Sequence, residues 1–298
     1  MIPKKKILII KHGSVGDIFM SFDSLEAISD LYGSLTLCST KNGFKLFELL
    51  NINFNKIIDN RSKNPFLNLK VIFQIINGKF DLVIDLQNSK RTSVYLFFLK
   101  LFTKSISNGT SKFATHRYIS SNLNEHAKEG LQNQLSLLGI SQRKNLNPIK
   151  RIVKKQIIFV PGSSINGKHK RWPIKYYIEV MKYFSKNKIK SIVIGGADEK
   201  DISDFIPKDD PLIVNLIGKS PWPEVKKIAL HSIITVTNDT SAMHFISNLN
   251  LPILAIMNDN KYAQRNYPLS DRSIVIKSMN INDITQEEVI NEISKFIK

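Results

Sequence analysis

The chain has 298 residues, of which 42% are hydrophobic and 23% are charged, a composition typical of a globular protein with room for two domains. No apolar run reaches the roughly 18 residues that a membrane-spanning helix needs. The single cysteine, Cys38, excludes an intramolecular disulfide framework and fits a reducing compartment. The basic start of the chain is followed by too short an apolar run for a signal peptide, so we expect a cytoplasmic protein.

The formal net charge is +18 at pH 7, and the basic residues are scattered along the chain rather than set in one stripe. A solvated surface explains most of this charge, whereas a phosphate-rich partner or an anionic membrane face is the functional alternative. No interleaved aromatic platform, zinc-ligand spacing or helix-turn-helix signal supports nucleic-acid binding. We therefore expect no nucleic-acid partner.

The first predicted strand, 6–10, is continuously apolar, as expected of a parallel strand buried on both faces. It leads into the sequence KHGSVGD at 11–17, and apolar residues at helical spacing then predict a helix as far as Leu31. The two glycines would let a ligand approach closely, although their spacing differs from the dinucleotide-binding fingerprint. Asp17 is expected at the carboxyl edge of the sheet, either as a helix N-cap or as a general base for a hydroxyl group.

Strands and helices then alternate, which predicts βαβ units and a parallel sheet. In the first half of the chain, further strands are predicted at 34–39, 56–59, 81–85 and 105–108. Helices are predicted between them at 41–50, 65–77 and 89–102. A further amphipathic helix, 124–138, carries His126, which we interpret either as a surface residue or as a substrate contact.

The polar and basic segment 141–155 is predicted to be an interdomain linker. The pattern then restarts with a buried strand at 156–160, a loop of small and basic residues, and a helix from 174 to 184. Four cationic or potentially cationic side chains precede Trp172-Pro173 in this loop, namely Lys168, His169, Lys170 and Arg171. They either hold a diphosphate or form a solvated basic loop.

The next strand and glycine turn, 191–196, is followed by Asp198 and Glu199. A carboxylate at this place either receives a ribose hydroxyl or only caps the next helix. A short strand at 212–216 and a helix at 223–230 come next, followed further on by a strand at 251–257 and an amphipathic helix at 284–297.

Between these elements lies a β-branched strand that begins at Ile233 and leads into a polar turn and the start of a helix. Four turn residues suit an N-cap: Asn238, Asp239, Thr240 and Ser241. A helix N-terminus at the carboxyl end of a strand favours anions, so the turn is either an anion site or an ordinary cap. The two βαβ runs together predict two doubly wound, Rossmann-like α/β domains, 1–150 and 151–298, that face one cleft.

The ordered motifs resemble those of the lipopolysaccharide heptosyltransferases, glycosyltransferase family 9, over nearly the whole chain. The segments that carry the resemblance are Gly16-Asp17, Pro161-Gly162, Lys170-Arg171-Trp172-Pro173, Gly195-Gly196 and Asn238-Asp239-Thr240 with Met243-His244. The resemblance implies the GT-B architecture, with an N-terminal acceptor domain and a C-terminal nucleotide-sugar domain. It also implies inverting transfer of heptose from ADP-heptose to a lipid A core acceptor, with no cofactor and no obligatory metal.

Residue by residue, the resemblance implies that Asp17 is the catalytic base and that Lys170 contacts the donor phosphate or sugar. Asp239, Thr240 and His244 match the segment in which a helix N-terminus meets the donor phosphate. The match is looser for Glu199, implied to meet the donor nucleoside, and for Ser220, near the adenine. The remaining donor candidates are Gly162, Ser163, Gly196 and Ser241, and the acceptor candidates are Lys11, Ser14, Gly16 and His126.

The sequence departs from the family pattern at three places. Ser241 stands where the family usually has glycine, Asp23 replaces an expected proline, and the turn at 257–260 lacks the usual glycine. Two other hypotheses therefore stay open: an epimerase or hydrolase with the same fold, and a nucleotide-sugar or glycolipid binder without turnover. We expect a monomer that acts on an anionic glycolipid at the inner face of the cytoplasmic membrane.

Overall fold

The computed structural model describes residues 5–141, 151–261 and 263–297. Contacts within the chain divide it into two units, residues 1–144 and 145–298, each described here by itself. The predicted linker, 141–155, falls largely outside the described residues. Its described end belongs to the second unit, because the Lys154 amide donates to the His231 carbonyl at 2.8 Å and Arg151 Nη1 donates to the Ser232 carbonyl at 3.0 Å.

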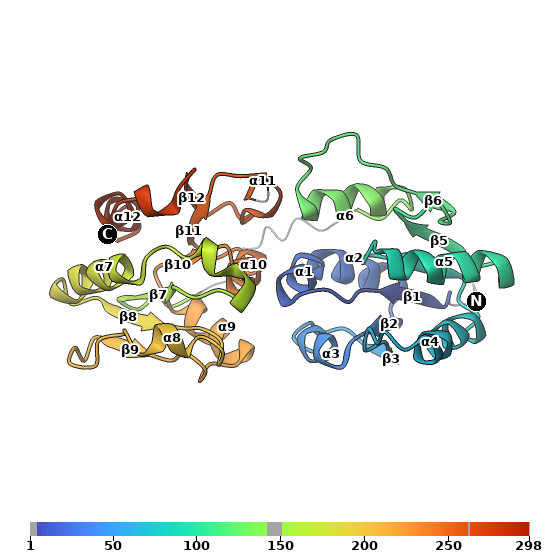
Figure 1. Cartoon of the computed structure of the whole chain (residues 1–298), viewed down its shortest axis with the longest axis horizontal. Coiled ribbons are helices and arrows are strands. Elements are labelled where there is room, and N and C mark those ends of the chain that lie inside the picture. Colours follow the sequence, from blue (N-terminus) through green and yellow to red (C-terminus); the bar gives the residue numbers. More distant parts are fainter. Residues whose placement is uncertain (1–4, 142–150, 262, 298) are drawn as a thin grey trace. The chain divides into compact units, whose positions relative to one another are not determined.

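The first unit alternates strands and helices. Its strands are β1 (Ile7–Ile10), β2 (Leu35–Ser39), β3 (Phe54–Ile58), β4 (Leu82–Asp85), β5 (Ile106–Gly109) and β6 (His116–Arg117). Its helices are α1 (Val15–Met20), α2 (Phe22–Tyr32), α3 (Lys41–Phe47), α4 (Pro65–Asn77), α5 (Lys90–Phe102) and α6 (Ala127–Ser136). Among the described residues these strands form one parallel sheet in the order β3-β2-β1-β4-β5-β6, so β1 is central and the order reverses between β1 and β4 (Figure 1).

The faces of this sheet follow from the alternation of side chains along its strands. Leu8 and Ile10 of β1 point to one face, where the inner sides of α4 and α5 pack on them through Val71, Ile75 and Leu96. Continuous apolar strands are needed because helices cover both faces of a parallel sheet. The sheet thereby fixes the loops after β1 and β4 next to each other.

The second unit repeats this plan. Its strands are β7 (Gln156–Val160), β8 (Lys190–Val193), β9 (Ile213–Asn215), β10 (Thr235–Asn238), β11 (Ile253–Asn258) and β12 (Ser273–Ser278). Its helices are the 3₁₀ segments η1 (Ile165–Lys170) and η2 (Ile281–Asp283), with α7 (Ile174–Lys186), α8 (Lys200–Ser203), α9 (Trp222–Leu230), α10 (Ser241–Asn248), α11 (Ala263–Asn266) and α12 (Gln286–Ser294). The described strands form a parallel sheet in the order β12-β11-β10-β7-β8-β9, with its reversal between β7 and β10 (Figure 1).

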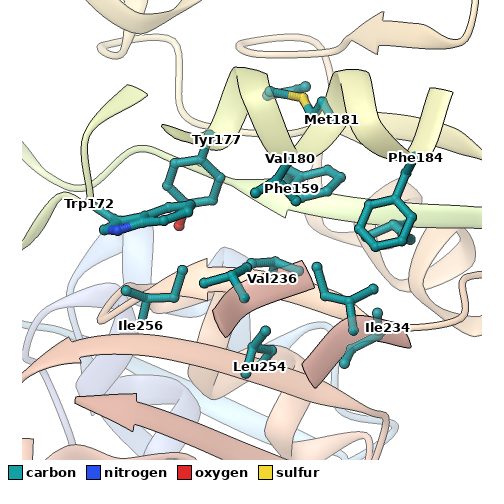
Figure 2. Close-up of a cluster of buried hydrophobic side chains, with 14 of the residues drawn as sticks. Phe159, Trp172, Tyr177, Val180, Met181, Phe184, Ile234, Val236, Leu254 and Ile256 are labelled. Atoms are coloured by element: carbon teal, nitrogen blue, oxygen red, sulfur yellow. The ribbon is translucent and has the colours of Figure 1, made fainter. Parts of the chain in front are cut away.

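The core of the second unit lies between α7 and the sheet (Figure 2). Tyr177, Val180 and Phe184 of α7 face Phe159 of β7, and Trp172 lies at the end where the basic loop meets this helix. The Trp172 and Tyr177 rings meet edge to face, with centroids 4.9 Å apart at 77°. Aromatic pairs of this geometry add about 1 kcal/mol beyond their area burial, so Trp172 anchors the loop that precedes α7.

The structure confirms most predicted elements and corrects others. The helix predicted from the apolar spacing as far as Leu31 is broken at Ser21 into α1 and α2. Strands β6 and β12 were not predicted from the sequence. β6 has only two residues, and the apolar pattern of β12 is interrupted by Lys277. No helix in the described parts of the chain has both the length and the apolar character needed to cross a bilayer.

Candidate functional site

In the second unit, the loops after β7, β8, β9 and β10 meet at the carboxyl edge of one sheet, beside the point where the strand order reverses. Ligands of open α/β sheets bind at such a place. All the donor candidates predicted from the sequence lie on these loops or on the helices that follow them. They are Gly162, Ser163, Lys170, Gly196, Glu199, Ser220, Asp239, Thr240, Ser241 and His244.

Asn238, at the end of β10, is a fully buried side chain that joins this strand to the loop after β7 and to α7. Its Oδ1 accepts from the Trp172 amide at 3.1 Å and from the Tyr177 hydroxyl at 3.0 Å, and its Nδ2 donates to the Pro161 carbonyl at 2.8 Å. The sequence suggested an N-cap role for Asn238, and this was wrong. The cap of α10 is Thr240, whose hydroxyl accepts from the Met243 amide at 3.4 Å.

Lys170 and Asp239 form the ion pair nearest the start of α10. Lys170 Nζ lies 2.5 Å from Asp239 Oδ2, and the two side chains are 30% and 12% exposed. The pair brings together the basic loop and the polar turn, which are far apart in the sequence. A helix N-terminus and a partly buried ammonium group at one place favour an anion such as a phosphate.

The other cations of the basic loop have different positions. The Arg171 guanidinium donates from Nη2 to the Ser163 carbonyl at 2.7 Å, from Nε to Ser163 Oγ at 3.0 Å, and from Nη1 to Asp201 Oδ2 at 2.9 Å. Lys168 Nζ lies 3.3 Å from the same Asp201 oxygen. Asn258 Nδ2 donates to the His169 carbonyl at 3.1 Å, so the glycine-free turn after β11 is tied to this loop. The loop is therefore ordered.

Glu199 lies folded against the two glycine turns. Its side chain is 8% exposed, and its Oε2 is buried with no hydrogen-bond partner among the described residues. A Cβ added at Gly162 would lie 1.8 Å from this oxygen, and one at Gly195 would lie 2.2 Å from it. Burial raises the pKa of the Glu199 carboxyl from 4.5 to about 7, although the Arg171 charge opposes the shift.

The Glu199 side chain does not cap the helix that follows it. Glu199 occupies the N-cap position of α8 but makes no side-chain capping bond there. Leaving a buried acceptor unsatisfied costs about 1–3 kcal/mol, so a ligand hydroxyl that donates to it would recover free energy. The capping alternative weighed for this carboxylate is thus contradicted.

The remaining donor candidates, Ser220, Ser241, His244 and Gly196, lie around the same edge of the sheet. Ser220 Oγ donates to the Leu216 carbonyl at 3.0 Å, at the end of the loop after β9. Ser241 is the first residue of α10 and is half-buried, and His244 is buried one turn later. A Cβ added at Gly196 would lie 2.4 Å from Asp198 Oδ1.

In the first unit, the loop after β1 ends in a capping box. Ser14 is the N-cap of α1, and Asp17 Oδ2 accepts from the Ser14 amide at 3.1 Å and from the Ser14 hydroxyl at 3.0 Å. Asp17 is therefore not the N-cap itself but its partner three residues on. Gly13 has φ +90°, and a Cβ there would lie 3.0 Å from Asp17 Cβ. Gly16 lies within α1, so only Gly13 of the two glycines needs its conformational freedom.

A buried cation lies beside Asp17. Lys11 Nζ donates to the Leu86 carbonyl at 3.1 Å, and burial lowers the pKa of this ammonium group while the charges of Asp17 and Asp85 act against that shift. Asp85 is fully buried at the end of β4, where burial raises the pKa of its carboxyl. The amides of Gln87 and Asn88 donate to its Oδ1, both at 3.0 Å. Lys11 and Asp17 thus lie at the reversal point of the first sheet.

Sequence reasoning missed a buried polar network next to this loop. Asp59, just after β3, accepts from the Tyr95 hydroxyl at 2.6 Å and from Arg91 Nη1 at 3.3 Å, and its Oδ2 lies 3.1 Å from His12 Nε2. Burial alone would raise the pKa of Asp59, but hydrogen bonds with His12, Tyr95 and the Arg61 amide outweigh it and hold that pKa below its usual value. The residues come from distant elements, and no sequence motif joins them.

His12, Cys38 and Asp59 are the cluster in the described chain whose atoms lie close enough to share a metal ion. The cluster does not fit a metal well. Asp59 already accepts from a hydroxyl and a guanidinium group, and burial raises the pKa of the Cys38 thiol above its usual value. We therefore interpret it as a hydrogen-bonded clasp that joins β1, β3 and α5.

Two residues singled out from the sequence have structural roles at α6. His126 is 2% exposed, so the surface-residue interpretation was wrong, and its Nδ1 accepts from the Lys128 amide at 3.2 Å as the N-cap of this helix. Asp23, which stands in place of proline, has its Oδ2 2.6 Å from Lys128 Nζ. This ion pair joins α2 to α6.

Two hollows, of about 820 and 860 Å³, lie at the amino-terminal edges of the two sheets, away from the candidate loops at the carboxyl edges. Arg151 and Lys155 line the first, and Lys79 and Lys104 line the second. Since ligands of parallel sheets bind at the carboxyl edge, neither hollow is the candidate site.

We compared the chain with known protein families, protein sequences and solved structures. A family model described as glycosyltransferase family 9 (heptosyltransferase) matches residues 114–293. A search among curated protein sequences returned no match.

Solved structures resemble the whole chain. The E. coli ADP-heptose LPS heptosyltransferase II has a TM-score of 0.75 at 18% identity over 98% of both chains. The family 9 glycosyltransferase from Veillonella parvula has 0.80 at 20% identity over 99% of this chain and 98% of that one. An E. coli heptosyltransferase with ADP-2-deoxy-2-fluoro heptose has 0.76 at 14% identity over 97% and 99%. Together with the two doubly wound units, these matches confirm the GT-B fold class.

Proposed function

Since this chain belongs to glycosyltransferase family 9 and is a glycosyltransferase, we propose that it transfers a heptose, or a related sugar, from ADP-heptose to a lipopolysaccharide core or lipid A acceptor. We assign donor binding to the second domain, 151–298, and acceptor binding to the first, 1–150. The observation that carries the proposal is the convergence of Lys170, Asp239 and Glu199 at one edge of the second sheet.

The donor diphosphate would bind between Lys170 and the first turn of α10. Asp239 forms an ion pair with Lys170, and an incoming diphosphate would compete for that ammonium group. The amides at the start of α10, with the hydroxyls of Thr240 and Ser241, would supply further donors. His244 follows within the same helix. Charge that builds on the leaving diphosphate would be stabilised here by about 3 kcal/mol for each well-placed donor.

The donor nucleoside would lie along the glycine turns. Glu199 has a buried acceptor oxygen, and the two ribose hydroxyls are donors that would satisfy it. Gly162 and Gly196 leave room for the backbone to approach the ligand, and Ser163 and Ser220 flank this path. A negative charge on Glu199 would strengthen hydrogen bonds from ribose hydroxyls, so we expect donor affinity to rise as pH increases through about 7.

We assign the role of general base to Asp17. The Ser14 hydroxyl and amide hold its carboxylate, and the buried charge of Lys11 lies nearby. In the proposed step the acceptor oxygen bonds to the anomeric carbon while its proton passes to Asp17. The bond between that carbon and the diphosphate oxygen breaks on the opposite face, and ADP leaves. Gly16, and His126 at the start of α6, are the further acceptor contacts that we propose.

This chemistry inverts the anomeric configuration and requires no metal. We further propose a monomeric enzyme that works at the inner face of the cytoplasmic membrane, where an anionic glycolipid acceptor would be presented. Asp239, Asp17 and Asp201 are engaged by Lys170, Ser14 and Arg171, respectively, whereas Glu199 Oε2 has no hydrogen-bond partner among the described residues.

The experiment measures ADP release and the anomeric configuration of the product with ADP-heptose and a lipid A core acceptor. Asp17→Asn should lower kcat by about 10²- to 10⁴-fold, the usual contribution of a general base, with donor binding unchanged. Unaltered turnover in this variant would exclude Asp17 as the base. A product with retained configuration would contradict the displacement mechanism.

Donor binding is tested separately by thermal stabilisation with a panel of ADP- and UDP-sugars, because a ligand of the native state raises the unfolding temperature by mass action. ADP-heptose should stabilise the protein most. Lys170→Ala should weaken this effect, whereas the matched control Lys168→Ala, which removes a lysine paired with Asp201, should not. Equal losses in both variants would assign the effect to general charge rather than to Lys170.

A further inference from the structure

Helices α4 and α5, whose positions Figure 1 shows, expose apolar side chains on the sides that do not pack on the sheet. In each helix three of the four exposed apolar residues follow a spacing of three and then four, which places them on one stripe, and Leu67 and Phe102 are exposed beside the stripes. The two stripes consist of Phe66, Leu69 and Phe73 in α4 and of Val94, Phe97 and Leu101 in α5. We call these six residues the two-helix face.

The fold does not need the two-helix face. Ile72 and Ile75 of α4 and Leu96 and Leu99 of α5 already pack on the sheet from the opposite sides of the helices. A surface helix of a globular protein normally has polar residues opposite its buried stripe. Here Phe73 is 66% exposed, so the apolar outer stripe is unexplained by core packing.

The two stripes lie on neighbouring helices. Both helices cover the same side of the sheet, and the side chains of Arg91 in α5 and Asn68 in α4 join them through a hydrogen bond of 2.5 Å. On α5 the face continues into an aromatic group, in which the Phe97 and Phe113 rings have centroids 5.0 Å apart. Exposed apolar residues gathered on neighbouring helices in this way indicate an interaction site.

The charge around the two-helix face is positive. Neither helix contains an aspartate or a glutamate, and the segment 60–113 holds nine lysines and arginines against Asp81 and Asp85. Asp85 is buried, and Asp81 accepts from the Lys6 amide at 2.7 Å. The exposed lysines within or beside the helices are Lys63, Lys70, Lys79, Lys90, Lys100 and Lys104.

We propose that the two-helix face docks the protein on an anionic lipid bilayer. Apolar side chains that alternate with lysines suit the boundary between lipid headgroups and acyl chains. Burial of the apolar side chains and the attraction of the lysines to anionic headgroups both favour binding. A second copy of the chain is the less suitable occupant, since two such faces would bring lysines against lysines. The surface gives a physical basis to the membrane location proposed above, and it lies on the acceptor-binding unit.

The test is co-sedimentation of the purified full chain with vesicles that contain no glycosyl acceptor. One set is made of equal parts phosphatidylglycerol and phosphatidylcholine, and the other of phosphatidylcholine alone. The native protein should bind the anionic set and be released by salt, because exposed lysines contribute part of the attraction. Equal binding to both sets, or binding to neither, would overturn the proposal.

Two variants locate the surface. Phe73→Ser with Phe97→Ser should lower partitioning onto the anionic vesicles by about tenfold or more. The matched control is Phe205→Ser, a phenylalanine of the second unit that is 63% exposed and should leave partitioning unchanged. Lys70→Glu with Lys100→Glu should weaken binding and flatten its salt dependence. Unchanged thermal unfolding of each variant verifies that the fold is intact.

The alternatives give distinct results. If the native protein is a dimer and the double phenylalanine variant is a monomer with unchanged vesicle binding, the face is a self-interface and the proposal is wrong. Transfer to a detergent-dispersed acceptor should be unchanged in the double phenylalanine variant. Failure of vesicle binding would therefore leave the proposed transfer untouched, and failure of transfer would leave the docking surface untouched.

Discussion

The environment of Glu199 predicts how the stability of the protein depends on pH. Burial raises the pKa of its carboxyl from 4.5 to about 7, so the folded state holds this proton more tightly than the unfolded state does. The stabilisation is complete below about pH 4.5 and is lost as pH rises to about 7 and above. At about 1.4 kcal/mol per pKa unit, the whole effect is about 3 kcal/mol.

The substitution Glu199→Gln removes this titration and keeps the size of the side chain. Between about pH 5 and about pH 8, the free energy of unfolding of the native protein should fall by about 2.5 kcal/mol relative to that of the variant. Urea unfolding followed by tryptophan fluorescence measures the change, because Trp172 and Trp222 are the two tryptophans of the chain and both lie in the second unit with Glu199.

The control is Asp204→Asn, which removes an exposed carboxylate five residues further along the chain. Its stability should follow that of the native protein at both pH values. If the native protein and Glu199→Gln differ by the same amount at both values, to within about 0.5 kcal/mol, the carboxyl titrates normally and our description of its burial is refuted.

Two further substitutions test how the loops of the second unit are held. Asn238→Ala should lower the free energy of unfolding by about 3–5 kcal/mol, because it leaves the buried Trp172 amide and Pro161 carbonyl without their partner. Urea unfolding measures the loss, and a value below about 1 kcal/mol would contradict this role of Asn238. Gly162→Ala should cost about 1 kcal/mol less in a Glu199→Ala background than in the native protein, since the added Cβ would lie 1.8 Å from Glu199 Oε2. If the losses of stability from Gly162→Ala and Glu199→Ala add in the double variant, the added methyl group does not clash with the Glu199 side chain.

The fold could be predicted from the sequence because its strongest signals are local. The apolar runs of β1, β7 and β11 and the helical spacing of α4 and α7 are each visible within a dozen residues. Each strand that ends in a glycine or polar turn also indicates where the carboxyl edge lies. The strand β12 was missed because its alternating pattern is weak and Lys277 interrupts it.

The site could be predicted only in part, because its decisive contacts join distant segments. The pairing of Lys170 with Asp239 spans 69 positions, and that of Asn238 with Trp172 spans 66. An asparagine at the end of a strand resembles a cap in any sequence, and only the fold shows that Asn238 is buried and bonded to Pro161, Trp172 and Tyr177. The same holds for Asp59, whose partners Tyr95 and His12 come from other elements.

Each of the two sheets is drawn from one uninterrupted stretch of chain. The described strands of the first lie between residues 7 and 117, those of the second lie between 156 and 278, and α12 returns to pack beside α7. Neither half borrows a strand from the other, so the gene can be cut once without dividing a sheet. Under the proposed division of donor and acceptor binding, a half that binds one nucleotide sugar could then be recombined with a half that binds a different acceptor, which would make this architecture suited to building new sugar linkages from existing domains.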